Sequence, residues 1–292
     1  MFLSFVKWVG VVVSLVAIGQ WIFGDVSESL GRVYGSMGNP NFLAQMLIFP
    51  LFAAFYDRNL WRKVAIMAVI GVAIYLTGSR AVMLGVGLAF YLWFMFFGKV
   101  KWFYKGLLTL GLVILGGFLV FGMDTRSFYS RMFLWGSVGD ILSLRDLVFG
   151  TGIETFYSRY VAVMPAEVFE YEQFFSTPSS IHNEFLEAVV ERGIFGALLY
   201  LFMIVYLLWS LFVRKVKWRW VGLGILAYVI AVQFSFSTVV HYVFLGAFWA
   251  VYLFDGRGKV FKVNRVLLLA ISGLILFSSV CLMISDFMLK RG

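Results

Sequence analysis

Residues 194–213 read IFGALLYLFMIVYLLWSLFV, a run of twenty residues without a charged side chain. A helix needs about 20 mostly apolar residues to cross the hydrocarbon core of a bilayer, so this run predicts a transmembrane helix. The rest of the chain has the same character, because 62% of its 292 residues are hydrophobic and only 13% are charged. Water-soluble domains do not have this composition. We expect an all-α integral membrane protein.

Nine segments have the apolar character of a span, and the second of them is short and contains Pro50. The first carries only Lys7 and no clear cleavage site, which favours a span over a signal peptide. The expected spans are Phe2–Phe23, Phe42–Tyr56, Val64–Gly78, Ala81–Phe97, Gly106–Gly122, Ile194–Val213, Trp220–Phe236, Val239–Phe254 and Val266–Ser285.

Charges between these spans predict the orientation. Four alternate connections hold fourteen basic residues against the two acids Asp57 and Asp255, whereas the opposite side holds nine basic and thirteen acidic residues. By the positive-inside rule the basic connections and the N-terminus are cytoplasmic, and the C-terminus is outside. The chain then divides into five spans in 1–122, an extracytoplasmic loop with short helices in 123–193, and four spans in 194–292.

Several other functions are disfavoured. The net charge of +9 lies in short connections, where it orients spans rather than binding nucleic acid. Cys281 is alone, so one chain cannot form a disulfide or a thiolate zinc site. A phosphate-binding G-x-x-x-x-G-K-[ST] loop is missing from the sequence, so energy for a reaction must come from an activated substrate. We expect neither a cofactor nor a metal.

The stretch from Ser179 to Glu187, SSIHNEFLE, lies where the polar loop re-enters the membrane. We expect His182 to lie early in a helix that follows Thr177-Pro178 and runs into the next span. An imidazole at this boundary is a candidate catalytic base; the alternative is a structural hydrogen-bonding role. Asn183 and Glu184 beside it are candidate substrate-binding residues.

Arginines on the same side are candidates for holding an anion. Arg80 lies in a break so short between two spans that its charge is costly unless something anionic pairs with it. Arg131 is expected on an interfacial helix, where it would lie on the same face as Trp135. For Arg80 the alternative is an orienting or snorkelling arginine. For Arg131, and more so for Arg126, it is contact with lipid headgroups. The remaining candidate substrate-binding residues are Arg32, Asn39, Asn41, Arg126 and His241, the last with helix–helix bonding as its alternative.

Four blocks in this order resemble the O-antigen ligase and polymerase family of bacterial membrane glycosyltransferases. They are Gly38-Asn39-Pro40-Asn41-Phe42-Leu43-Ala44; Thr77-Gly78-Ser79-Arg80-Ala81; Arg131 with Trp135 followed by Gly150-Thr151-Gly152-Ile153; and His182-Asn183-Glu184-Phe185-Leu186-Glu187 with Glu191-Arg192-Gly193-Ile194-Phe195-Gly196.

The resemblance implies an integral-membrane glycosyltransferase (GT-C-like) fold and metal-independent transfer of a glycan from a polyprenyl diphosphate at the outer face of the bacterial cytoplasmic membrane. It implies that Arg80 and Arg131 hold the diphosphate and that His182 acts on the acceptor, which is a lipid or a glycan. Family members usually have about four more spans before the first block, which a partner chain would have to supply here. The alternatives are a polymerase of the same family, a polysaccharide or lipid transporter, and an inactive truncated homologue.

Overall fold

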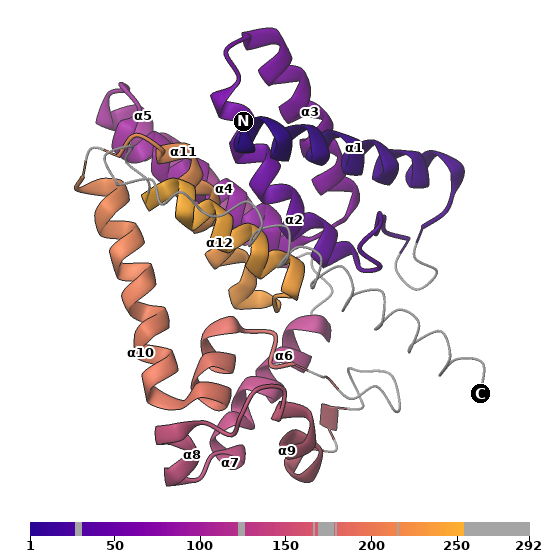
Figure 1. Cartoon of the computed structure of the whole chain (residues 1–292), viewed down its shortest axis with the longest axis vertical. Helices are drawn as coiled ribbons and strands as arrows, with labels where there is room; N and C mark the ends of the chain where they lie inside the picture. The colour runs from indigo at the N-terminus through magenta and orange to yellow at the C-terminus, as the bar shows by residue number, and fades with distance from the viewer. Residues whose placement is uncertain are drawn as a thin grey trace, which may run out of the picture. The chain divides into compact units, whose positions relative to one another are not determined.

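The computed structural model describes residues 1–26, 31–121, 126–165, 167–168, 178, 180–214 and 216–253, with the main chain alone at 112–121 and 126–128. Every regular element in these residues is a helix (Figure 1). By its internal contacts the chain divides into Met1–Leu253 and Phe254–Gly292, and all the described residues belong to the first unit.

The eight expected spans that precede residue 255 are all helical. They correspond to α1 (Phe2–Phe23), α2 with η1 (Pro40–Ala53, Ala54–Tyr56), α3 (Leu60–Leu76), α4 (Arg80–Phe97), α5 (Trp102–Phe121), α10 (Glu184–Phe212), α11 with η3 (Arg219–Ala231, Val232–Phe234) and α12 (Val239–Leu253). The ninth, Val266–Ser285, lies outside the described residues, so the total of nine stays a prediction.

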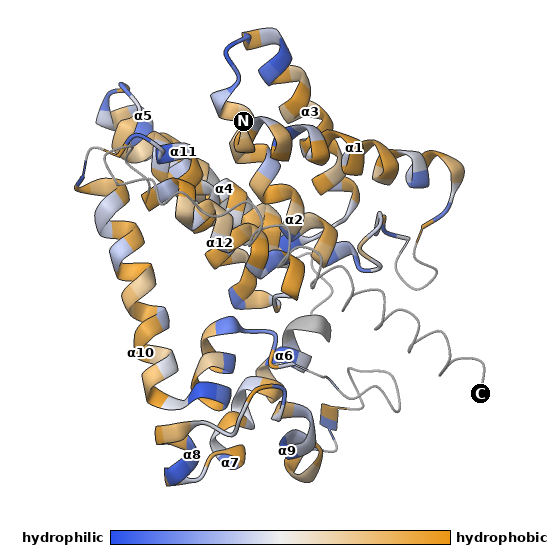
Figure 2. Cartoon of the chain, in the orientation of Figure 1, coloured by the Kyte–Doolittle hydropathy of each residue, from blue (hydrophilic) through white to orange (hydrophobic). Residues whose placement is uncertain are grey.

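Length and composition identify membrane-spanning helices within the described part of the chain. Helices α1, α4 and α10 are long and apolar enough to cross a bilayer, and three shorter helices are also apolar. Hydrophilic residues gather at helix ends and in the connections (Figure 2). These observations agree with an integral membrane protein.

Asparagine side chains set the start of three of these helices. The side-chain oxygens of Asn39, Asn59 and Asn183 accept hydrogen bonds from the main-chain N–H groups of Asn41, Arg62 and Leu186, at the starts of α2, α3 and α10. Such caps satisfy N–H groups that have no partner within the helix. The cap at Asn183 corrects one expectation: α10 begins at Glu184, so His182 precedes the helix instead of lying within its first turns.

Close helix contacts form where one partner is glycine. A methyl group on Gly10 of α1 would lie 2.2 Å from Cβ of Pro50 in α2, and one on Gly85 of α4 would lie 2.3 Å from the carbonyl oxygen of Ala227 in α11. Small residues let membrane helices approach this closely. They place α2 and α11 at the centre of the main hydrophobic core.

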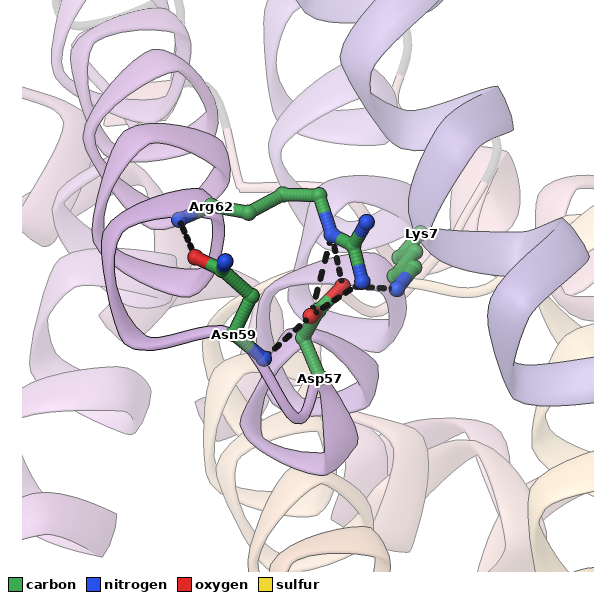
Figure 3. A network of polar contacts seen from close by, with 4 residues as sticks. All are labelled: Lys7, Asp57, Asn59 and Arg62. Atoms are coloured by element: carbon green, nitrogen blue, oxygen red, sulfur yellow. Dashed lines mark hydrogen bonds and ion pairs between the residues drawn. The ribbon is translucent and has the colours of Figure 1, made fainter.

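A buried charge cluster joins α1 to the connection between η1 and α3 (Figure 3). Lys7 pairs with Asp57, and the Arg62 guanidinium donates to both carboxylate oxygens of Asp57 at 2.8 Å. The Asp57 side chain is 0% exposed. Hydrogen bonds from Arg62 and then Lys7 hold the pKa of Asp57 well below its usual range. These residues therefore do more than orient the chain, the role that the sequence predicts for charge on this side.

We expect Asp57→Asn to lower the melting temperature of the purified protein by about 5 °C or more, because it leaves Lys7 beside an uncharged amide. Differential scanning fluorimetry in detergent measures the shift. Arg58→Ala, one residue along and exposed, is the control and should change little. Equal melting temperatures for Asp57→Asn and wild type would contradict a stabilising cluster.

The loop predicted at 123–193 contains four described helices: α6 (Arg126–Gly136), α7 (Val138–Ile141), α8 (Leu144–Phe149) and α9 (Phe156–Val163). They have a small hydrophobic core of their own, which includes Leu134, Phe156, Tyr160 and Ile181. The described part of this region thus consists of short helices, and its extracytoplasmic placement stays a prediction.

Candidate functional site

The site is built around the segment that leads into α10. Trp135 on α6 donates its indole N–H to the carbonyl oxygen of Ile181 at 3.0 Å, and Ile181 is buried. His182 follows with a main-chain φ of 54°, an unusual value for a residue other than glycine. Residues held in such conformations cluster at functional sites, so this geometry agrees with a functional role for His182.

The His182 imidazole lies in a shielded, positively charged environment. Burial first, and then the charge of Arg131 on α6, lower the pKa of His182 to about 4. Both effects disfavour the protonated ring. Among the predicted residues, Arg131 and His182 are therefore neighbours, and the imidazole is neutral near pH 7.

One phenylalanine ring, Phe236, packs against His182, and a second, Phe42, packs against Phe236. The Phe236 ring meets the His182 ring edge-on, with 5.1 Å between centroids, and meets the Phe42 ring at the same distance. Phe42 lies in the first turn of α2. Phe236 is not among the site residues predicted from the sequence, although the polar residues Ser235, Ser237 and Thr238 around it mark an interruption between two apolar segments.

Glu184 and His241 bond to the segment that carries Phe236. The Glu184 carboxylate accepts hydrogen bonds from Ser237, at 2.9 Å, and from Tyr242. Nδ1 of His241 accepts from the main-chain N–H of Thr238 at 3.1 Å, so Nε2 carries the proton and donates to the carbonyl oxygen of Phe42 at 2.9 Å. These contacts are within the protein, and substrate binding by Glu184 and His241 stays a prediction.

A second group of residues forms at the start of α4, and we call Arg32 and Arg80 the arginine pair. Arg32 donates to the carbonyl oxygen of Thr77 and, at 3.0 Å, to the side chain of Asn41. Burial first, and then the neighbouring charge of Arg80, lower the pKa of Arg32. Two neighbouring guanidinium groups repel each other, and a bound anion would offset the repulsion.

The first turn of α2 connects the arginine pair to His182. Asn41 bonds to Arg32, and the next residue, Phe42, touches Phe236, which in turn touches His182. One short stretch of chain therefore contacts Arg32 directly and His182 through Phe236. Two arginines and one imidazole arranged in this way can bind a phosphate group and accept a proton nearby.

The other predicted residues have more limited roles in the structure. Asn39 and Asn183 accept hydrogen bonds as helix caps. Arg126 begins α6, but its side chain lies outside the described residues. Glu187 and Glu191 follow Glu184 along one face of α10, where they accept from Ser180 and from the main-chain N–H of Glu154. Among the residues that the structure describes, no cluster of His, Cys, Asp and Glu could hold a metal ion.

Two glycines explain why the motifs around 150 and 193 occur together. Helix α8 ends against a break in α10, where Gly193 has φ 65° and ψ −164°. A methyl group on Gly150 would lie 2.1 Å from the carbonyl oxygen of Glu191, and one on Gly193 would lie 2.3 Å from that of Val148. Main-chain hydrogen bonds from Thr151 and Gly152 to Val190 and Glu191 complete this joint. The motifs join the loop to the membrane helix.

We expect Gly193→Ala to destabilise the protein by about 2 kcal/mol or more, because the added methyl group meets backbone and the conformation is restricted to glycine. Gly139→Ala is the matched control, since its methyl group would meet nothing within 4 Å. Thermal unfolding and limited proteolysis of the loop compare the two variants. Equal stabilities would show that the joint relaxes freely.

The fold and the site together define a class of protein. It is a helical membrane protein with an arginine pair and a shielded histidine where the loop meets the membrane helices. A family model described as O-antigen ligase matches residues 64–201. This match supports assignment to the O-antigen ligase family, as the motifs predict, and the matched region contains Arg80, Arg131, His182 and the joint glycines. No curated protein and no solved structure shows significant similarity to the chain.

Proposed function

We propose that the protein transfers a glycan from a polyprenyl diphosphate to an acceptor hydroxyl at the outer face of the bacterial cytoplasmic membrane, with inversion and without a metal. The observation that carries this proposal is the contact path from the arginine pair through Asn41, Phe42 and Phe236 to His182. This path links an anion-binding group to a proton acceptor. The similarity of residues 64–201 to O-antigen ligases makes a glycan the expected substrate.

The arginine pair and Arg131 would receive the diphosphate. Breaking the bond between the anomeric carbon and the diphosphate leaves negative charge on the leaving group, and guanidinium groups can bind it in a bidentate manner. Because Arg32 is already held by Thr77 and Asn41, it pays little ordering entropy on binding. Charge stabilisation by such fixed groups substitutes for the metal ion of other phosphate chemistry.

His182 would take the proton from the attacking hydroxyl. The new bond forms between the acceptor oxygen and the anomeric carbon, the bond to the diphosphate oxygen breaks, and the hydroxyl proton passes to the imidazole. Attack opposite the leaving group inverts the anomeric centre. The low pKa of His182 in the resting protein follows from burial and Arg131, and a diphosphate bound to Arg131 would raise it by adding negative charge. Donor binding thus prepares the base.

An apolar cavity suits the isoprenoid part of the donor. It has a volume of about 330 Å³ and is lined by Phe90, Trp93 and Phe94 of α4 with Leu108 of α5. Phe90 is ten residues along α4 from Arg80, which corresponds to about 15 Å of helix. A chain attached to a diphosphate at Arg80 can reach this cavity along one helix.

The test is a transfer reaction with membranes that contain the protein, a defined polyprenyl-diphosphate glycan and EDTA. We expect the glycan on the acceptor with inverted linkage and one released polyprenyl diphosphate per transfer, and membranes without the protein should give neither. A glycolipid acceptor and a second donor molecule, supplied in separate reactions, distinguish the ligase from the polymerase. Movement of intact donor across the bilayer without product would instead indicate a transporter.

A further inference from the structure

The segment Ser235–Thr238 lies between η3 and α12 and has no regular secondary structure. Its residues are nevertheless held firmly. Ser237 donates to the buried Glu184 carboxylate and bonds with the Tyr228 hydroxyl at 2.6 Å. Thr238 bonds to the fully buried His241 through both its main-chain N–H and its hydroxyl. Phe236 therefore lies in a segment that hydrogen bonds from Ser237 and Thr238 hold in place.

These hydrogen bonds hold the Phe236 ring against the His182 ring. The Phe236 ring meets both the His182 ring and the Phe42 ring, and His241 donates a hydrogen bond to the carbonyl oxygen of Phe42. Polar groups buried in a membrane protein are costly and are kept where they are needed. Here two of them hold an aromatic ring against the candidate base.

We propose that Phe236 is a positioning residue that shields the His182 imidazole from water, and that Glu184 and His241 hold it there through Ser237 and Thr238. Its role as a positioning residue rests on the proposed function, because it acts through His182. Removing the ring would admit water and weaken the effect of burial, so the proton affinity of His182 would rise. Of the charged groups, Arg131 acts on the imidazole, and the neighbouring helices α10 and α12 also carry Glu184, Glu187, His241 and Tyr242.

The experiment uses the two histidines of the chain as spectroscopic probes. Full-length protein with ring-labelled histidine is placed in lipid nanodiscs without donor, and nuclear magnetic resonance follows both imidazoles against pH. His182→Asn assigns the signals. Wild-type His182 should titrate at about 4. In Phe236→Ala the midpoint should rise by at least about one unit towards the ordinary value, and Ser237→Ala should raise it less.

Controls and rescue make the result specific. Phe202→Ala, which removes an exposed ring from α10, should leave the midpoint unchanged, and Phe236→Leu, which keeps an apolar side chain, should preserve most of the shift. A midpoint in Phe236→Ala within about 0.3 unit of wild type would overturn the inference. If Phe236→Ala does not fold, an unchanged midpoint in Ser237→Ala would do the same.

Turnover measured on the same preparations separates this inference from the proposed function. In Phe236→Ala, kcat/KM for transfer should fall between pH 7.5 and 5.5 while the wild-type value stays level, because only the neutral ring accepts a proton. A shifted titration without any transfer by wild type would refute the proposed function and leave the shielding in place. Transfer with an unshifted titration would refute the shielding.

Discussion

Replacing His182 by asparagine should slow glycan transfer by about 10²- to 10⁴-fold, the usual contribution of a general base. Asparagine is the informative substitution, because it tolerates the positive φ of His182 better than alanine does. It can still form hydrogen bonds but cannot accept the proton. The loss should therefore appear in the rate of the chemical step and leave the folded protein intact.

Single-turnover reactions with donor and acceptor in excess over KM measure this effect. Donor binding is followed separately by the rise in melting temperature that the lipid diphosphate causes. We expect the same rise in wild type and His182→Asn. Full turnover in His182→Asn would remove the imidazole from the mechanism, and a structural hydrogen-bonding role would then explain its burial.

The second large effect concerns the arginine pair, and it has opposite consequences for activity and stability. Arg80→Ala should lower transfer by about 10²- to 10³-fold, as expected when one donor to a developing negative charge is lost. It should not lower the melting temperature of the donor-free protein, because it also removes the repulsion that lowers the pKa of Arg32. A residue kept for structure would show the reverse.

Arg145→Ala is the matched control, since Arg145 is an exposed arginine of α8. It should leave both transfer and stability unchanged. Arg80→Lys keeps the charge but not the bidentate geometry, and we expect intermediate activity. A melting temperature clearly lowered by Arg80→Ala, with transfer as in wild type, would assign Arg80 to the fold.

The order of the helices follows from the sequence because a bilayer demands long apolar runs whatever the tertiary packing. The bounds Phe2–Phe23 were predicted as the structure has them, and Ile194 as the start of a span coincides with the break at Gly193. The predicted start of α10, after Thr177-Pro178, was wrong. Pro178 and Asn183 both suit a helix start, and only the folded backbone shows that Asn183 caps the helix.

Some residues of the candidate site can be predicted from the sequence and others cannot. Arg80, Arg131 and His182 stand out in the sequence because a titratable group among apolar residues is costly. Phe236 does not, because a phenylalanine in an apolar protein is ordinary until its neighbours are known. Arg62 is predicted from the sequence only as orienting charge, because charge counts do not show that Lys7 and Asp57, fifty residues apart, meet.

Helix α1 illustrates how tightly such neighbours are matched. In the sequence it resembles any signal anchor, yet Gly10 fits the Pro50 ring and Lys7 reaches Asp57. Replacing it with a leader helix from an expression vector would keep insertion but leave a misfit against α2. Tags for production therefore belong ahead of Met1, and chimaeras with related proteins should exchange α1 and α2 together.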